Sequence, residues 1–159
     1  ETREVFQRLY ASCGADHLFR GLRRRGPSSL TTVLHGEPWE KNIMFRAGDD
    51  SACLFLDWKN AKLATGTLDL AFLIFSSADA DIIARHTKPA LKAYTDSLTE
   101  ALKALAPDCK PPTLKEVERD FKASTADALL QAICMLVQEM QHLEKNWVSN
   151  NPSNNKDTK

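Results

Sequence analysis

The chain has 159 residues, of which 43% are hydrophobic and 26% are charged, values close to the average for globular domains. This length suits one domain with a real core, because a chain of this size buries about two-thirds of its unfolded surface. Lys plus Arg and Asp plus Glu both number 21, so the charge balance argues against nucleic acid or an anionic membrane surface as a partner.

The apolar runs and the cysteines argue against further classes of protein. The longest apolar run, Leu68 to Phe75, is far shorter than the roughly 20 residues of a membrane helix. The four cysteines, Cys13, Cys53, Cys109 and Cys134, form no C-x-x-C pair, so neither a zinc site nor a thioredoxin-like site is indicated. We therefore expect a soluble, cytoplasmic protein with reduced thiols and no membrane partner.

The first 29 residues predict a helix and a loop. Val5, Phe6, Leu9 and Tyr10 recur at helical spacing, and Gly14 is expected to end the helix. The polar segment 15–29 contains the basic run GLRRRGP, which predicts a solvated loop. The chain opens without Met, an apolar targeting segment or a cleavage site, so we expect a fragment of a longer protein.

Three short strands are predicted next. TTVLH (Thr31–His35) contains β-branched residues and is followed by Gly36, which is typical of a strand that enters a loop. IMFR (Ile43–Arg46) and CLFLDW (Cys53–Trp58) predict a hairpin joined by AGDDSA. The second of these runs is almost continuously apolar, which predicts burial on both faces and places Asp57 at the end of a strand.

Helices are predicted for most of the remainder. TLDLAFLIFSS (Thr67–Ser77) is expected to be a core helix with Thr67 or Asp69 as its cap, and Pro89–Leu105 is an amphipathic helix with Pro in its first turn. After PDCKPP, one or two more helices are expected to about Met140, followed by a disordered polar tail over residues 149–159. The order of elements predicts an α+β, mostly helical fold.

Four polar residues are brought near one another by this hairpin: His35, Glu37, Asn42 and Asp57. Carboxylate and amide oxygens suit Mg²⁺, which prefers a few protein oxygens and substrate phosphates. A further carboxylate near a substrate hydroxyl would accept its proton in a phosphoryl transfer. Taken singly, however, His35 is more often a buried organiser of a loop, and Asp57 more often caps a turn.

Two other enzyme classes are poorly supported. The triplet His35-Gly36-Glu37 matches the H-x-E of zinc-dependent nucleobase deaminases, but their second motif, P-C-x-x-C, is absent from the sequence. A serine hydrolase is not indicated either, because no G-x-S-x-G motif occurs.

The runs HGEPWEKNIMF and LDWKNAKLATGTLDLAFLIFSS carry a family resemblance. They resemble the catalytic core of the ecdysteroid kinase-like (CHK kinase-like) family, within the aminoglycoside and choline phosphotransferase superfamily. That core reads approximately H-G-D-x-W-x-x-N-x-M-F, then a metal-binding D-F-Q, then a D-L motif that opens an apolar helix. The motifs extend from about Val33 to Ser77, and the helical remainder to about Met140 agrees in order and length.

The resemblance implies a role for each matching residue. Glu37 occupies the place of the catalytic base, Asn42 that of one Mg²⁺ ligand, and Asp57 that of the second, phosphate-bridging ligand. His35 is expected with Glu37 among the catalytic residues, where it would brace the catalytic loop, and Asp69 would have a structural role in supporting that loop. The implied cofactors are ATP and Mg²⁺, bound through Asn42 and Asp57.

Two departures from the family pattern stand in this sequence. The family base is Asp, and the extra methylene of Glu37 moves the carboxylate by roughly 1.5 Å, a C–C bond length. A misplacement of about 1 Å can lower a rate on the order of 100-fold. The second departure, Trp58-Lys59 in place of Phe-Gln, keeps an aromatic residue beside the metal-binding Asp, and we interpret it as tolerable.

From this resemblance we expect residues 1–148 to be the C-terminal lobe of a kinase-like fold, with the N-terminal ATP-binding lobe absent from this chain. The expected function is ATP-dependent phosphorylation of a hydroxyl on a small molecule, such as a steroid-like alcohol, and the isolated chain is expected to be inactive. The alternative is a truncated or degenerate member that binds but does not catalyse. The sequence does not indicate a particular substrate or oligomeric state.

Overall fold

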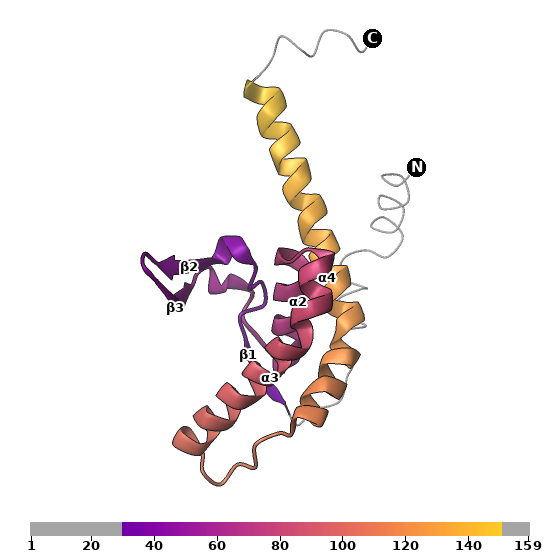
Figure 1. Cartoon of the computed structure of the whole chain (residues 1–159). Coiled ribbons are helices and arrows are strands. Elements are labelled where there is room, and N and C mark those ends of the chain that lie inside the picture. Colours follow the sequence, from indigo (N-terminus) through magenta and orange to yellow (C-terminus); the bar gives the residue numbers. More distant parts are fainter. Residues whose placement is uncertain (1–29, 151–159) are drawn as a thin grey trace.

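The computed structural model describes residues 30–150 (Figure 1). The predicted helix of the first dozen residues and the loop up to Ser29 lie outside the described residues, as do residues 151–159 of the predicted tail. The described part is mostly helical with small antiparallel strand pairs, which confirms the predicted composition of elements. Its strands are β1 (Thr31–Leu34), β2 (Ile43–Arg46), β3 (Asp49–Phe55) and β4 (Lys62–Thr65).

The four strands form two separate antiparallel pairs. Strand β1 pairs with β4, and β2 pairs with β3 in a hairpin with an irregularity between Phe45 and Arg46. Because β3 begins at Asp49, the hairpin turn is only Ala47-Gly48, and the prediction that AGDDSA forms the connection was wrong over most of that segment. Gly48 adopts a φ of 78°, a conformation that favours glycine in a tight turn.

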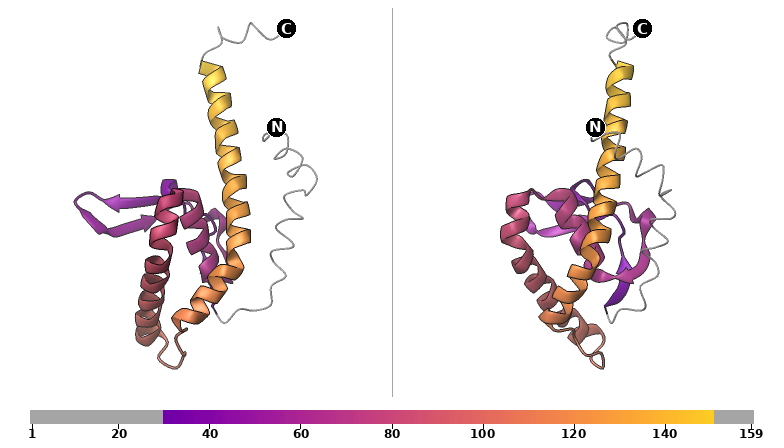
Figure 2. Two further views of the ribbon diagram at one scale, coloured as in Figure 1. Left: turned by 45° about the vertical axis from the view of Figure 1, so that its right-hand side comes forward. Right: turned by 90° about the vertical axis from the view of Figure 1, so that its right-hand side faces the viewer.

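Strand β3 is not buried on both faces, so that prediction was also wrong. Cys53 is exposed, and Leu54 and Phe55 retain 61% and 36% of their surface exposed. The hairpin contains only two strands and projects away from the helices (Figure 1 and the left view of Figure 2), so no second layer formed by residues 30–150 covers its faces. An apolar run predicts a strand, but it does not establish that another layer packs on it.

Helix α2 (Gly66–Ser77) is the predicted core helix. Ala71 and Phe72 are completely buried and belong to one cluster with Val117, Ala128 and other apolar residues of α4. The helix begins one residue before the predicted segment, and its N-cap is Thr65, which makes no side-chain capping bond. The prediction that Thr67 or Asp69 caps this helix was therefore wrong.

Helix α3 (Ala80–Leu105) is longer than predicted, and Pro89 lies inside it rather than in its first turn. The start is explained by Asp79, whose side chain accepts a hydrogen bond of 2.8 Å from the backbone N–H of Ile82. Leu91 is the buried apolar residue of this helix, as expected for an amphipathic pattern.

Helix α4 (Leu114–Asn150) is one continuous element of 37 residues, which includes the first two residues of the predicted tail. Its start is a reciprocal capping arrangement: the Glu116 carboxylate accepts from Thr113 N–H at 2.8 Å, and Glu116 N–H donates back to the Thr113 hydroxyl at 3.3 Å. The C-terminal half extends beyond the rest of the molecule (Figures 1 and 2). Between residues 30 and 150, no helix combines the length and the apolar character of a transmembrane segment.

Candidate active site

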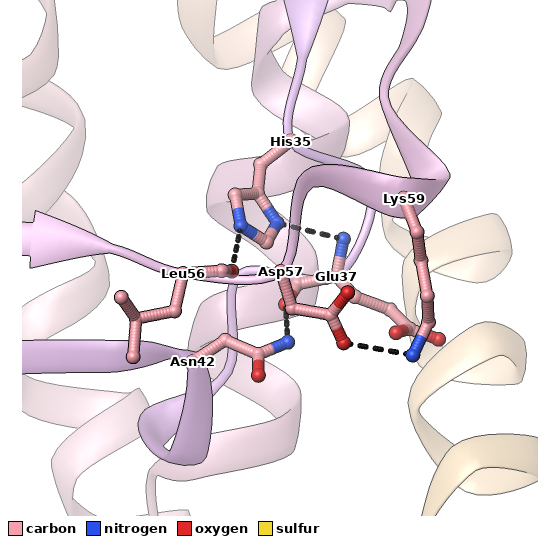
Figure 3. Close-up of polar contacts among 6 residues, drawn as sticks. All are labelled: His35, Glu37, Asn42, Leu56, Asp57 and Lys59. Atoms are coloured by element: carbon pink, nitrogen blue, oxygen red, sulfur yellow. Dashed lines mark hydrogen bonds and ion pairs between the residues drawn. The ribbon is translucent and has the colours of Figure 1, made fainter.

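His35 follows β1 and links the loop after it to the segment after β3. It is buried, and the Nε2 atom of its ring lies 2.6 Å from the Leu56 carbonyl oxygen, while Glu37 N–H donates to Nδ1 at 3.3 Å (Figure 3). A carbonyl only accepts, so these contacts assign the proton to Nε2 and leave Nδ1 as an acceptor. The ring also contacts Trp58, with ring centroids 4.7 Å apart. With both nitrogens engaged, His35 acts as a structural link, in agreement with the simpler interpretation of a buried loop histidine.

Asp69, in the first turn of α2, lies behind the same loop. Its carboxylate accepts hydrogen bonds from the backbone N–H groups of His35 at 2.6 Å and Gly36 at 3.1 Å. Burial raises the pKa of Asp69, because desolvation of the carboxylate outweighs the effect of these two donors. Asp69 therefore holds the loop rather than capping its own helix.

Gly36 is fixed from two further directions. Its carbonyl oxygen accepts a hydrogen bond of 2.6 Å from Gln131 Nε2 on α4, a residue 95 positions away in the sequence. Its φ is 93°, and a Cβ atom added there would overlap the backbone carbonyl of Asn60, whose carbon would lie at 2.9 Å. Only glycine fits this position without displacing the Asn60 peptide.

Glu37 has a strongly restrained backbone and an unrestrained carboxylate. Its carbonyl oxygen accepts hydrogen bonds from Trp39 N–H and from Asn42 Nδ2, both at 3.0 Å, while its N–H donates to His35. Among residues 30–150, nothing forms a hydrogen bond or an ion pair with the Glu37 carboxylate. The residue is half-buried, and within the described residues its carboxylate is left without a hydrogen-bonding partner.

Asn42 ends the short 3₁₀ helix η1 (Glu40–Asn42) and is joined directly to the residue before Asp57. The Asn42 carbonyl oxygen accepts from Leu56 N–H at 2.9 Å. Because the amide nitrogen of Asn42 is used by the Glu37 carbonyl, its Oδ1 oxygen takes no part in that bond. The Asn42 amide thereby retains a hard oxygen donor beside the Asp57 segment.

Asp57 adopts a left-handed conformation, with φ 61° and ψ 62°, and it is the only non-glycine residue with a positive φ in the part of the chain that the structure describes. It precedes the short 3₁₀ helix η2 (Trp58–Asn60) but makes no side-chain capping bond to it. The interpretation of Asp57 as a simple turn cap is therefore not supported. A left-handed aspartate is uncommon, and such strain is often found at functional sites.

The Asp57 side chain is paired with Lys59. Lys59 Nζ lies 2.7 Å from Asp57 Oδ2, and the two side chains are 66% and 39% exposed. The hydrogen bond from Lys59 lowers the pKa of Asp57, and Asp57, with a smaller contribution from the Glu37 charge, raises the pKa of Lys59. Both negative charges of the site therefore act on this one ammonium group.

The structure thus brings His35, Glu37, Asn42 and Asp57 together (Figure 3). Asp69 holds the backbone of the same loop through its hydrogen bonds with His35 and Gly36. Two contacts were not predicted. The Lys59 contact was not predicted because the Trp58-Lys59 departure was interpreted as tolerable, although a lysine two residues after the predicted metal ligand Asp57 is a visible signal. The contact between Gln131 and the Gly36 carbonyl is not indicated by any pattern in the sequence around either residue.

The oxygen donors of the site fit Mg²⁺. Asn42 Oδ1 and the Asp57 carboxylate are hard ligands, and Mg²⁺ in phosphoryl-transfer enzymes is held by one or two protein oxygens together with phosphates and water. Within residues 30–150 there is no group of three or more His, Cys, Asp and Glu side chains that could hold a metal ion. The candidate set is therefore this amide and this carboxylate.

A mostly helical protein whose loop and hairpin unite a carboxylate, an amide and a second carboxylate has the features of a kinase-like phosphotransferase. The model of the ecdysteroid kinase-like family matches residues 4–106, more than half of the chain. The chain belongs to the ecdysteroid kinase-like family, which confirms the resemblance predicted from the sequence. No curated protein and no solved structure matches the chain.

Proposed function

We propose that this chain is the C-terminal lobe of an ATP-dependent kinase that phosphorylates a hydroxyl group of a small molecule, such as a steroid-like alcohol. Family membership supports the phosphotransferase class. The observation that carries the proposal is the double link through Leu56: its carbonyl accepts from His35, and its N–H donates to the Asn42 carbonyl. These bonds hold the Glu37 loop and the Asp57 segment side by side.

In this proposal Asn42 Oδ1 and the Asp57 carboxylate hold Mg²⁺, which when bound would neutralise charge on the phosphates of ATP. The Glu37 carboxylate accepts the proton of the substrate hydroxyl as the hydroxyl oxygen bonds to the γ-phosphorus and the bond to the ADP oxygen breaks. His35 and Asp69 keep the loop backbone in place and do not touch the reacting atoms. The sequence contains no Gly-rich phosphate motif, which supports assigning the chain to one lobe.

Asp57→Ala is expected to weaken binding of Mn²⁺, a spectroscopic substitute for Mg²⁺, by at least about tenfold, because one of two protein ligands is lost. The free Mn²⁺ signal in electron paramagnetic resonance measures this affinity on the 159-residue chain. Asp96→Ala is the matched control, because Asp96 is also an exposed carboxylate paired with a lysine, Lys92, at 2.5 Å. Equal affinity in Asp57→Ala and the unchanged chain would refute the metal assignment.

Glu37→Asp is expected to raise phosphotransfer on the order of tenfold, since small misplacements of a catalytic group carry large rate penalties. Three hydrogen bonds fix the Glu37 backbone, so the extra methylene cannot be absorbed by moving the main chain. Transfer of labelled γ-phosphate to a panel of hydroxylated small molecules, measured in the longest reading frame that contains these residues, checks this. Glu40→Asp is the control, and a lower rate in Glu37→Asp would show that Glu37 suits this site.

A second candidate, a non-catalytic member of the family that binds a ligand, is favoured by one contact: the Asp57 carboxylate is already paired with Lys59. A phosphotransfer assay on the longest reading frame separates the two candidate functions. A kinase would transfer phosphate in a manner that depends on Asp57, and a binding protein would transfer none. For the isolated chain we expect Mn²⁺ binding without ATP turnover under the first proposal.

A further inference from the structure

The η2 turn places Lys59 beside Asp57, a candidate metal ligand. The η2 turn is closed by a hydrogen bond of 3.0 Å from Ala61 N–H to the Trp58 carbonyl, and Trp58 Nε1 donates to the Phe55 carbonyl at 3.1 Å. The Asn60 carbonyl lies directly against Gly36 of the catalytic loop. The backbone that presents Lys59 is therefore fixed relative to Asp57 and Glu37, and only the lysine side chain is left to move.

The ammonium group lies where a divalent cation at Asp57 would have to compete with it. Lys59 Nζ is 2.7 Å from Asp57 Oδ2, so the ammonium group takes one acceptor site of this carboxylate and places a positive charge beside any metal ion bound to it. The side chain is 66% exposed, so it can turn into water. Exposed ion pairs of this kind contribute little to stability, which makes the contact easy to replace.

The charges around Lys59 determine how its contact with Asp57 affects cation binding. Asp57 and Glu37 supply two negative charges, and Lys59 supplies one positive charge that both of them stabilise. A second cation entering this site loses part of that field to Lys59 and is also repelled by it. Replacing Lys59 by a neutral residue would leave both carboxylates to the entering ion.

We propose that the Lys59 ammonium is an internal counter-ion of Asp57 whose positive charge opposes the binding of a divalent cation, so that Lys59 lowers the affinity of the free chain for metal. The proposal rests on the proposed function, because it takes Asp57 as a metal ligand. Under this proposal, Lys59 sets the metal affinity of the site in the absence of a bound phosphate group.

Lys59→Gln is expected to bind Mn²⁺ about threefold to tenfold more tightly than the unchanged chain, through the loss of an exposed competing charge. Lys59→Arg, which keeps the charge, should retain an affinity close to that of the unchanged chain. Lys92→Gln is the matched control, because it removes the lysine of the Asp96 ion pair on α3 and leaves the site intact. The gain in Lys59→Gln should also shrink at about 1 M salt, where charges are screened within roughly 3 Å.

The outcomes separate this proposal from the function on which it rests. If Asp57→Ala weakens Mn²⁺ binding but Lys59→Gln does not tighten it, the counter-ion role is wrong and the metal assignment stands. If Asp57→Ala has no effect, the metal assignment fails and the counter-ion role fails with it. An equal gain in Lys59→Gln and Lys92→Gln would reduce the effect to net charge and overturn the proposal.

Discussion

Gly36→Ala is expected to lower the free energy of unfolding by about 3 kcal/mol or more, from the combined effects of a strained φ and a steric overlap. The alanine would have to adopt a φ of 93°, and its Cβ would overlap the Asn60 carbonyl. Any shift that relieves the overlap also disturbs the hydrogen bonds that Gly36 makes with Asp69 and Gln131. Urea unfolding followed by circular dichroism measures the change.

Gly48→Ala is the matched control for this substitution. Gly48 has a similar positive φ of 78°, but a Cβ added there would meet nothing within 4 Å. It should therefore lose only the conformational part, about 1 to 2 kcal/mol for a non-glycine residue in the left-handed region. The difference in the free energy of unfolding between the two variants isolates the effect of the contact with Asn60. Equal losses would show that this contact does not affect stability.

Strands and helices were predictable where they depend on short-range sequence patterns. The β-branched run of β1 and the Gly-containing turn between β2 and β3 are short-range patterns, and the structure confirms strands there. The predicted start of α3 at Pro89 was wrong, because Asp79 provides the cap ten residues earlier. Pro89 costs this helix one backbone hydrogen bond, and the cost is tolerated because a helix of 26 residues retains its other hydrogen bonds.

Burial was less predictable, because it depends on what packs against an element. The apolar run that ends β3 is typical of a buried strand, yet Leu54 and Phe55 are exposed on a hairpin of only two strands. Helix α2 has a comparable apolar run and is buried, because α4 packs against it. Periodicity cannot distinguish these two cases.

The candidate site was predictable as a set of residues but not as a set of contacts. The motif order alone groups His35, Glu37, Asn42 and Asp57, since their loops are close in sequence. The contact between Gly36 and Gln131 joins residues 95 positions apart and depends on how α4 passes the loop. The pairing of Lys59 with Asp57 depends on the left-handed conformation of Asp57, which composition does not reveal.

Asp69→Ala is expected to lower the free energy of unfolding by about 2 to 5 kcal/mol, because two partly buried donors lose their acceptor. These donors are the backbone N–H groups of His35 and Gly36, and no other acceptor for them lies in residues 30–150. Asp81→Ala is the control, since Asp81 is also an acid in the first turn of a helix but forms an exposed ion pair with Arg85. That variant should lose less than about 1 kcal/mol.

Asp69→Asn separates the loss of an acceptor from the loss of charge. Its one amide oxygen can still accept from His35, but its NH₂ group would face Gly36 N–H, so it should lose about 1 to 2 kcal/mol and fall between the unchanged chain and Asp69→Ala. Because the same two bonds position the Glu37 loop, both variants should weaken Mn²⁺ binding in the same order as they lose stability. If Asp69→Ala unfolded at the urea concentration of the unchanged chain, the loop would be held by His35 and Gln131 alone.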